Sequence, residues 1–93
     1  MREYTIECRG LKSEAEFWAA YLAEVKPDGA HYFGRNLNAF WDAVSVGGPG
    51  SPGDNCALRF VHTDSLSTWR NGEFVSALRR IAAESKWVVI CID

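Results

Sequence analysis

The sequence predicts an α/β fold: a small three-stranded parallel sheet packed by three main helices and one short helix. Three apolar segments have the length and composition of strands, at residues 3–8, 56–62 and 87–92. Helical patterns fill the chain between each strand and the next, and such connections predict parallel pairing. Ninety-three residues provide for one hydrophobic core, so we expect a single domain over residues 1–93.

Two different periodicities indicate the first strand and the first helix. Residues 3–8 alternate between apolar and polar side chains, as in a strand that is buried on one face. Ser13 and Glu16 then form a capping box, in which each side chain satisfies a free backbone N–H at a helix start. The helix expected over residues 14–25 carries an apolar stripe that can pack on a sheet, made of Phe17, Trp18, Tyr21, Leu22 and Val25.

A second helix is expected over residues 36–45, with Asn36 as its N-cap. Its apolar residues follow the i, i+3, i+4, i+7 pattern of one buried helix face and are Leu37, Phe40, Trp41 and Val44. Asn38 and Asp42 stand on the opposite face. They are four residues apart and therefore neighbours in space.

The second half of the chain begins with a stretch rich in glycine and proline. Residues 45–55 predict a flexible surface loop, because this composition stabilises no packed structure. After the second strand, Asp64 or Ser65 can cap a short helical turn. The last helix is expected over residues 73–85, and the closing segment Trp87–Ile92 is apolar without alternation, which is typical of a strand covered on both faces.

Charge and composition argue against several classes of protein. The net charge is −2, whereas a nucleic-acid-binding protein normally carries a basic patch. No apolar segment is long enough to span a membrane, and the first residues lack the pattern of a signal peptide. The cysteines form no CxxC pair and each lies in or beside an apolar strand, so we expect buried, reduced, structural thiols and a cytoplasmic protein: Cys8, Cys56 and Cys91.

The chain lacks the parts of a catalytic or metal site. Its two histidines, His31 and His62, follow no ligand spacing such as HExxH. Asp42 alone does not make a paired-carboxylate site. We therefore expect no enzymatic activity, no catalytic residue, no metal and no cofactor. A Cys–His dyad that forms only in space is the enzymatic alternative that the sequence leaves open.

Residues 32–42, YFGRNLNAFWD, gather aromatic rings around one acid. Core packing accounts for Phe33, Leu37 and Phe40. It leaves Tyr32, Asn38 and Asp42 unexplained, because they fall in the loop and on the outer helix face. Aromatic rings beside an exposed charge are typical of a protein-binding hot spot.

The same segment closely resembles the YYGxNLDALWD segment of barstar-type ribonuclease inhibitors. The two agree at Tyr32, Gly34, Asn36, Leu37, Ala39, Trp41 and Asp42. Outside this segment the resemblance extends to the whole chain through the order of elements, the size and the apolar terminal strand. It implies a barstar-like domain, whose small parallel sheet packed by helices agrees with the fold expected from the residues alone.

The resemblance also implies a function, namely inhibition by plugging an active site. In that family the second helix and the preceding loop enter the ribonuclease cleft. Asp42 would occupy the phosphate position, Tyr32 would stack against the cleft, and Trp41 would be part core and part contact. The protein would then be an intracellular immunity protein, monomeric before it binds a small ribonuclease through Tyr32, Phe33, Gly34, Arg35, Asn38, Trp41 and Asp42.

Some residues depart from the family pattern and keep a second hypothesis open. The position aligned with Asn38 is commonly aspartate in the family, and Arg35 stands where an acid is known. The last helix offers mixed charges where an acidic rim would assist, at Arg79, Arg80 and Glu84. The alternative is a barstar-like protein-binding module whose partner is not a ribonuclease. The sequence does not decide which enzyme is inhibited, or whether residues 45–55 and the last helix add contacts.

Overall fold

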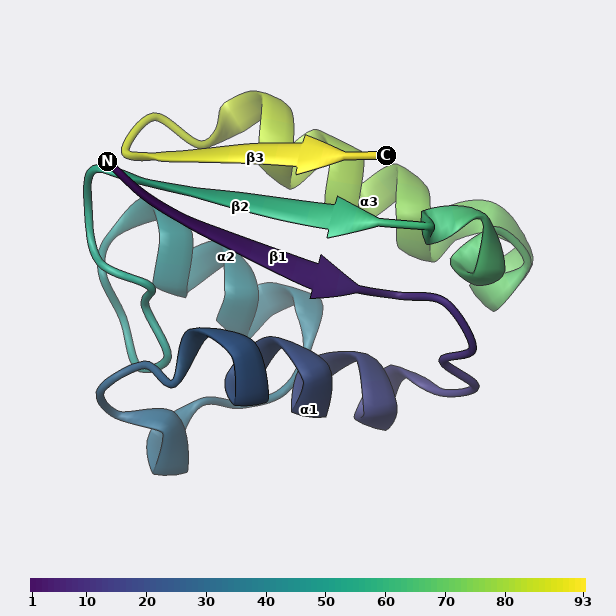
Figure 1. The fold of residues 1–93 in the computed structure, drawn as a ribbon, viewed down its shortest axis with the longest axis horizontal. Coiled ribbons are helices and arrows are strands. Elements are labelled where there is room, and N and C mark those ends of the chain that lie inside the picture. Colours follow the sequence, from purple (N-terminus) through teal and green to yellow (C-terminus); the bar gives the residue numbers. More distant parts are fainter.

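One parallel sheet organises the protein, as the sequence predicts. In the computed structural model, which describes residues 1–93, the strand order is β1-β2-β3 (Figure 1). The main elements are β1 (Arg2–Glu7), α1 (Glu14–Val25), α2 (Leu37–Ser45), β2 (Cys56–Val61), α3 (Glu73–Glu84) and β3 (Val88–Ile92). Short 3-10 turns cover Ala30–Tyr32, Thr63–Leu66 and Trp69–Gly72. The single short helix expected before α3 is therefore a pair of 3-10 turns, and a third precedes α2.

All three helices lie on one side of the sheet (Figure 1). The cause is the strand order: each connection joins neighbouring parallel strands, and right-handed crossovers in the same direction leave from the same face. The other face is bare. At its centre Thr5 is in register with Arg59 and Arg59 with Cys91, and all three residues are exposed.

The expectation that β3 is covered on both faces is wrong. Val89 is 51% exposed and Cys91 is also exposed, whereas Val88 on the helix side is buried. A run of five apolar residues does not distinguish a doubly covered strand from an edge strand with one apolar outer face. None of the helices has the length and apolar composition that crossing a membrane requires.

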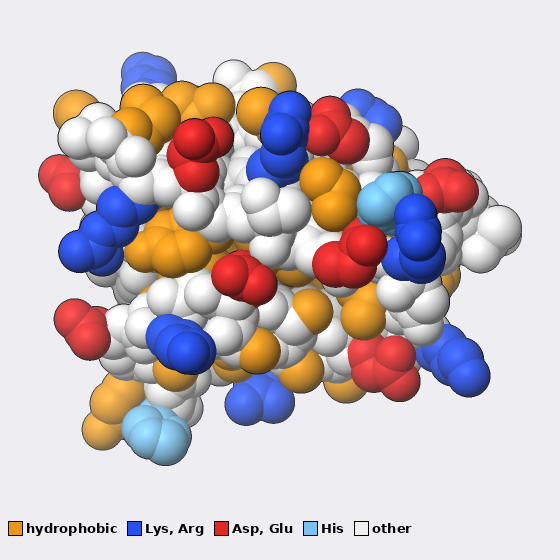
Figure 2. Space-filling model, in the orientation of Figure 1, with side chains coloured by type: hydrophobic (Ala, Val, Ile, Leu, Met, Phe, Trp, Pro, Cys, Tyr) orange, Lys and Arg blue, Asp and Glu red, His pale blue; other side chains and the backbone are white.

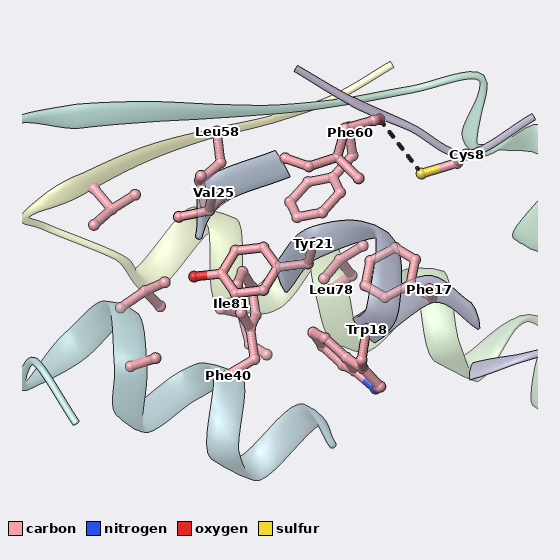
Figure 3. Packing of buried hydrophobic residues seen from close by; sticks show 14 of the residues in the cluster. Cys8, Phe17, Trp18, Tyr21, Val25, Phe40, Leu58, Phe60, Leu78 and Ile81 are labelled. Carbon is pink, nitrogen blue, oxygen red and sulfur yellow. Dashed lines mark hydrogen bonds between the residues drawn. The ribbon is translucent and has the colours of Figure 1, made fainter. Parts of the chain in front are cut away.

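The core lies between the sheet and the helices and is rich in aromatic rings. Phe17 of α1 stacks on Phe60 of β2, with ring centroids 5.3 Å apart. Figure 3 shows Phe17, Trp18 and Tyr21 extending from α1 into the space between β2 and Phe40 of α2. Such paired rings add to the free energy of burial through their edge-to-face and offset geometry. The apolar stripes expected on α1 and α3 are buried almost throughout, at Phe17, Trp18, Tyr21, Val25, Phe74, Leu78 and Ile81.

The predicted caps form at the starts of α1 and α2. Ser13 Oγ accepts a hydrogen bond from the Glu16 backbone N–H at 3.2 Å, and Glu16 Oε1 accepts one from the Lys12 N–H at 3.0 Å. Asn36 Oδ1 accepts from the Ala39 N–H at 2.7 Å. The bonds from the Glu16 and Ala39 N–H groups satisfy donors that the first helical turn leaves free, whereas the Glu16 carboxylate binds the N–H one residue before the cap.

The glycine-rich segment after α2 is anchored to the core, contrary to the expectation that it stabilises no packed structure. Gly50 and Pro52 are buried. The buried Tyr21 hydroxyl donates a 2.8 Å hydrogen bond to the Gly50 carbonyl, and burial raises the pKa of this tyrosine. A Cβ added at Gly50 would lie 2.6 Å from the Phe33 ring. The missing side chain is therefore what lets the loop close over Phe33.

This contact distinguishes two glycines that share a left-handed backbone. Gly50 has φ +86° and Gly47 has φ +74°, but nothing lies within 4 Å of a Cβ placed at Gly47. Alanine at either position loses about 1 kcal/mol of stability through backbone strain. Gly50→Ala also overpacks the core against Phe33, which adds about 1–3 kcal/mol. Urea unfolding should show the larger loss for Gly50→Ala, and equal losses would contradict the proposed contact.

The three cysteines are free, but they do not share one environment. Cys8 and Cys56 are buried as expected. Burial raises the pKa of the Cys8 thiol to about 12, and Cys8 Sγ lies 3.7 Å from the Ile6 carbonyl oxygen. The expectation of a buried thiol is wrong for Cys91, because it points from β3 to the bare face of the sheet.

Thiol reactivity should therefore separate into two classes. In native protein, an aromatic disulfide reagent should modify Cys91 quickly and the two buried thiols only as the protein opens. All three should react quickly in denaturant. Cys91→Ser should remove the fast phase alone, and a fast phase that persists in this variant would contradict the assignment.

Candidate protein-binding site

The outer face of α2 and the turn before it form the candidate site. Asn36 fixes both parts, since its Oδ1 caps the helix and its Nδ2 donates to the Gly34 carbonyl oxygen at 3.2 Å. Arg35, between Gly34 and Asn36, has φ +54°, a left-handed conformation that is unfavourable for a non-glycine residue. A Cβ at Gly34 would lie 3.1 Å from Ala39 Cβ, so the turn packs closely against the helix.

Tyr32 and Phe33 are adjacent in sequence but have opposite surroundings. Tyr32 ends a 3-10 turn and is 81% exposed, with no hydrogen bond to its hydroxyl. Phe33 is 5% exposed, and its ring lies 5.6 Å from that of Trp18 and 5.7 Å from that of Tyr21. Phe33 is predicted from the sequence both to pack in the core and to belong to the partner-binding segment, and its side chain lies in the core as expected. Its role is to hold the turn that exposes Tyr32.

Asp42 presents an unpaired carboxylate on the exposed face of α2. The ion pairs of the protein are Arg59–Asp93 and Arg70–Glu14, and neither these nor the His62–Glu7 contact includes it. Its backbone carbonyl accepts from the Val46 and Gly48 N–H groups, both at 3.1 Å, which closes the helix end. A Cβ at Gly48 would lie 3.4 Å from Asp42 Cβ, so the glycine leaves room beside this side chain.

The remaining predicted residues flank Asp42 as the helix periodicity requires. Asn38 is exposed one turn earlier, and Trp41 is half-buried. Both line a hollow of about 290 Å³ between α2 and α3. The structure therefore brings Asn38, Trp41 and Asp42 together on one helix, with Tyr32 and Arg35 exposed in the segment that leads into it.

Two further surfaces lie next to this site: a face of α3, whose contribution the sequence left undecided, and a hollow at the other end of α2, which the sequence analysis missed. Ala77, Arg80, Ile81 and Glu84 of α3 form the far wall of the hollow beside Trp41. At the other end of α2, a hollow of about 380 Å³ is lined by Val46 and by Trp87, which is 66% exposed. The sequence signal for Trp87 was an aromatic residue at the start of an apolar run, which was assigned to the covered strand.

The polar groups outside this region form no cluster that could hold a metal ion. No group of three or more His, Cys, Asp or Glu side chains is placed to hold a metal ion. Figure 2 shows acidic and basic side chains interspersed on the face that it draws, with the histidines at opposite ends. His31 lies beside Tyr32 in the 3-10 turn, and His62 follows β2.

His62 belongs to a chain of three charged or polar side chains at the carboxyl ends of β1 and β2. Its Nδ1 lies 2.6 Å from Glu7 Oε2, and its Nε2 lies 2.9 Å from Arg9 Nη2. A guanidinium can only donate, so Nε2 is the acceptor and Nδ1 carries the proton that is donated to Glu7. This hydrogen bond lowers the pKa of Glu7 below its ordinary value of 4.5.

The lowered pKa of Glu7 gives an expected pH dependence. A carboxyl group with a depressed folded-state pKa stabilises the fold above its unfolded value, and this contribution is lost as the pH falls through the folded value. His62→Gly should return the Glu7 pKa toward 4.5 without adding strain, because His62 itself has φ +58°. Carboxyl chemical shifts followed through an acid titration report this directly. An unchanged midpoint for Glu7 would contradict the role given to His62.

The fold defines this chain as a small α/β protein in which one helix and the turn before it expose an unpaired acid and a tyrosine. The family model described as Barstar (barnase inhibitor) matches residues 1–88. The chain belongs to the barstar family and is thus related to inhibitors of barnase type, not to enzymes. No curated protein gives a significant match to it.

Proposed function

We propose that this protein inhibits a small ribonuclease by inserting α2 and the turn before it into the enzyme's active-site cleft. The observation that carries the proposal is Asp42, an exposed carboxylate without an ion pair on a helix whose other face is buried. Membership of the barstar family supports the same conclusion.

The mechanism follows from the chemistry of a ribonuclease cleft, which binds the phosphate groups of RNA. Arginine pairs with carboxylate and phosphate in the same bidentate geometry, so an aspartate can replace a substrate phosphate. Asp42 makes no ion pair that would have to break before it binds. Asn36 caps the start of α2, and at its end the Asp42 carbonyl oxygen accepts hydrogen bonds from the Val46 and Gly48 N–H groups. The backbone that carries the Asp42 carboxylate is therefore fixed at both ends of the helix.

The other exposed residues would supply contact area and specificity. Tyr32 offers a rigid ring with little entropy to lose, as in many interface hot spots. Asn38, one helical turn before Asp42, can form a hydrogen bond with the enzyme. The half-buried Trp41 offers the exposed edge of its ring as a contact. Gly34 and Arg35 belong to the turn before α2 and would lie at the entrance of the enzyme's cleft.

The proposal includes an intracellular immunity role, in which a monomeric inhibitor protects the cytoplasm from a ribonuclease. Three free cysteines, of which Cys91 is exposed, fit a reducing compartment. The second candidate function is a barstar-like binding module with a different protein partner. The neutral Asn38 and the basic Arg35 favour it, because together they make this surface less acidic than the family pattern.

The test is inhibition of barnase and other small secreted ribonucleases by single-residue variants. Asp42→Ala should weaken inhibition by about 2 kcal/mol or more, roughly thirtyfold, because it leaves enzyme cations buried without a partner. Tyr32→Ala should weaken it less, and Asn38→Ala least, since a neutral amide forms no charge-assisted bond.

Glu24→Ala provides the control, because it also removes an exposed acid from a helix, but from α1. Thermal melts should show that all four variants fold, since substitutions of exposed residues change stability by about 0.5 kcal/mol or less. Asp42→Ala protein that inhibits as tightly as wild type would exclude the phosphate-mimic mechanism. Inhibition of none of the enzymes by wild type would favour the second candidate function.

A further inference from the structure

The charges around the candidate site differ between the two ends of α2, and α3 contributes some of them. α2 and α3 run in the same direction, because each leads back to the start of the strand that follows it (Figure 1). Leu37 at the start of α2 shares hollows with Ala77 and Arg80, and Trp41 one turn later shares one with Glu84. The order of residues along one helix therefore matches the order along the other.

The amino-terminal end of this surface carries unpaired positive charge. Arg80 lines both hollows beside Leu37, of about 350 and 290 Å³, and forms no ion pair. Arg35, two residues before α2, is exposed and equally unpaired. The nearby Arg70 differs, because Glu14 binds its guanidinium at 2.6 and 2.7 Å.

The carboxyl-terminal end carries the opposite charge. Asp42 lies there on α2, and Glu84 lies beside Trp41 on α3. Glu73 is the remaining acid in the hollows, and it acts on Arg70, whose pKa is raised chiefly by Glu14 and also by Glu73. Glu73 itself forms no ion pair, so the start of α2 carries Arg35, Arg80 and this one acid, whereas Asp42 and Glu84 further along carry negative charge alone.

We propose that the ribonuclease recognised by this protein carries acidic side chains on one side of its cationic cleft, where they face Arg80 and Arg35. This inference rests on the proposed function and extends the interface onto α3. With Asp42 in the cleft, a uniformly basic rim would bring like charges against both arginines, which disfavours binding. An acidic rim would pair with them and would fix the direction in which α2 lies across the enzyme.

Arg79 and Arg80 form a matched pair for the test. They are adjacent exposed arginines on α3, but Arg79 lines a different hollow, with His62 and Asp93. Inhibition constants should be measured for wild type, Arg80→Glu, Arg79→Glu, Arg35→Glu and Asp42→Ala against a panel of small secreted ribonucleases of known sequence that includes barnase. Each measurement should be made at low salt and at about 0.5 M salt, where exposed charges are screened.

We expect Arg80→Glu to weaken inhibition about tenfold or more at low salt, and Arg35→Glu to act in the same direction. Arg79→Glu should change it by less than about threefold. The Arg80→Glu effect should shrink in high salt, and the enzymes inhibited most tightly by wild type should carry acidic residues beside the cleft.

The results that would overturn the inference are distinguishable from one another. Equal effects of Arg80→Glu and Arg79→Glu, with Asp42→Ala still harmful, would remove the acidic rim and leave the proposed function intact. Failure of wild type to inhibit any enzyme, or Asp42→Ala without effect, would remove the proposed function and this inference together. Tighter inhibition by Arg80→Glu would also contradict the inference, because it would indicate a basic rim.

Discussion

The packing of Phe33 beneath Gly50 is the contact on which the candidate site depends. Phe33 connects the exposed turn to the aromatic rings of α1, and the loop after α2 closes over it with a hydrogen bond from the Tyr21 hydroxyl to the Gly50 carbonyl. Segments before and after α2 are thus fixed to the same group of rings. Tyr32 can project into solvent because the residue beside it is held in the core.

The charged side chains of the candidate site have no ion-pair partner within the protein. Asp42, Arg35 and Arg80 form no ion pair within the protein, whereas Glu14 and Arg70, a short distance along the surface, bind each other. Ion pairs between exposed groups add little to the stability of a fold. Leaving these three unpaired therefore makes little difference to folding, but it keeps their charges available to a protein that can desolvate them.

Local patterns in the sequence were sufficient to predict the helices and strands. They were not sufficient to predict contacts between residues that are far apart in the chain. The cap at Asn36, the stripes of the helices and the parallel pairing follow from spacing between near neighbours, so they were predictable. The buried position of Gly50 depends on a ring 17 residues earlier in the chain. The exposure of Cys91 depends on the order of strands, and the position of Arg80 beside α2 depends on how two helices align. None of these three features can be predicted from the residues that surround it in the sequence.

The strand order also determines when the site can form during synthesis. β1 pairs only with β2, so Arg2 must wait for Cys56, more than half the chain away, before its backbone finds a partner. α1 and α2 lie between these strands, and neither has a sheet to pack on until β2 has left the ribosome. Contacts that close so long a segment slow folding, because the entropy of closing it is lost before the contacts can compensate. A truncated nascent chain can therefore contain every residue of the site and still lack its surface.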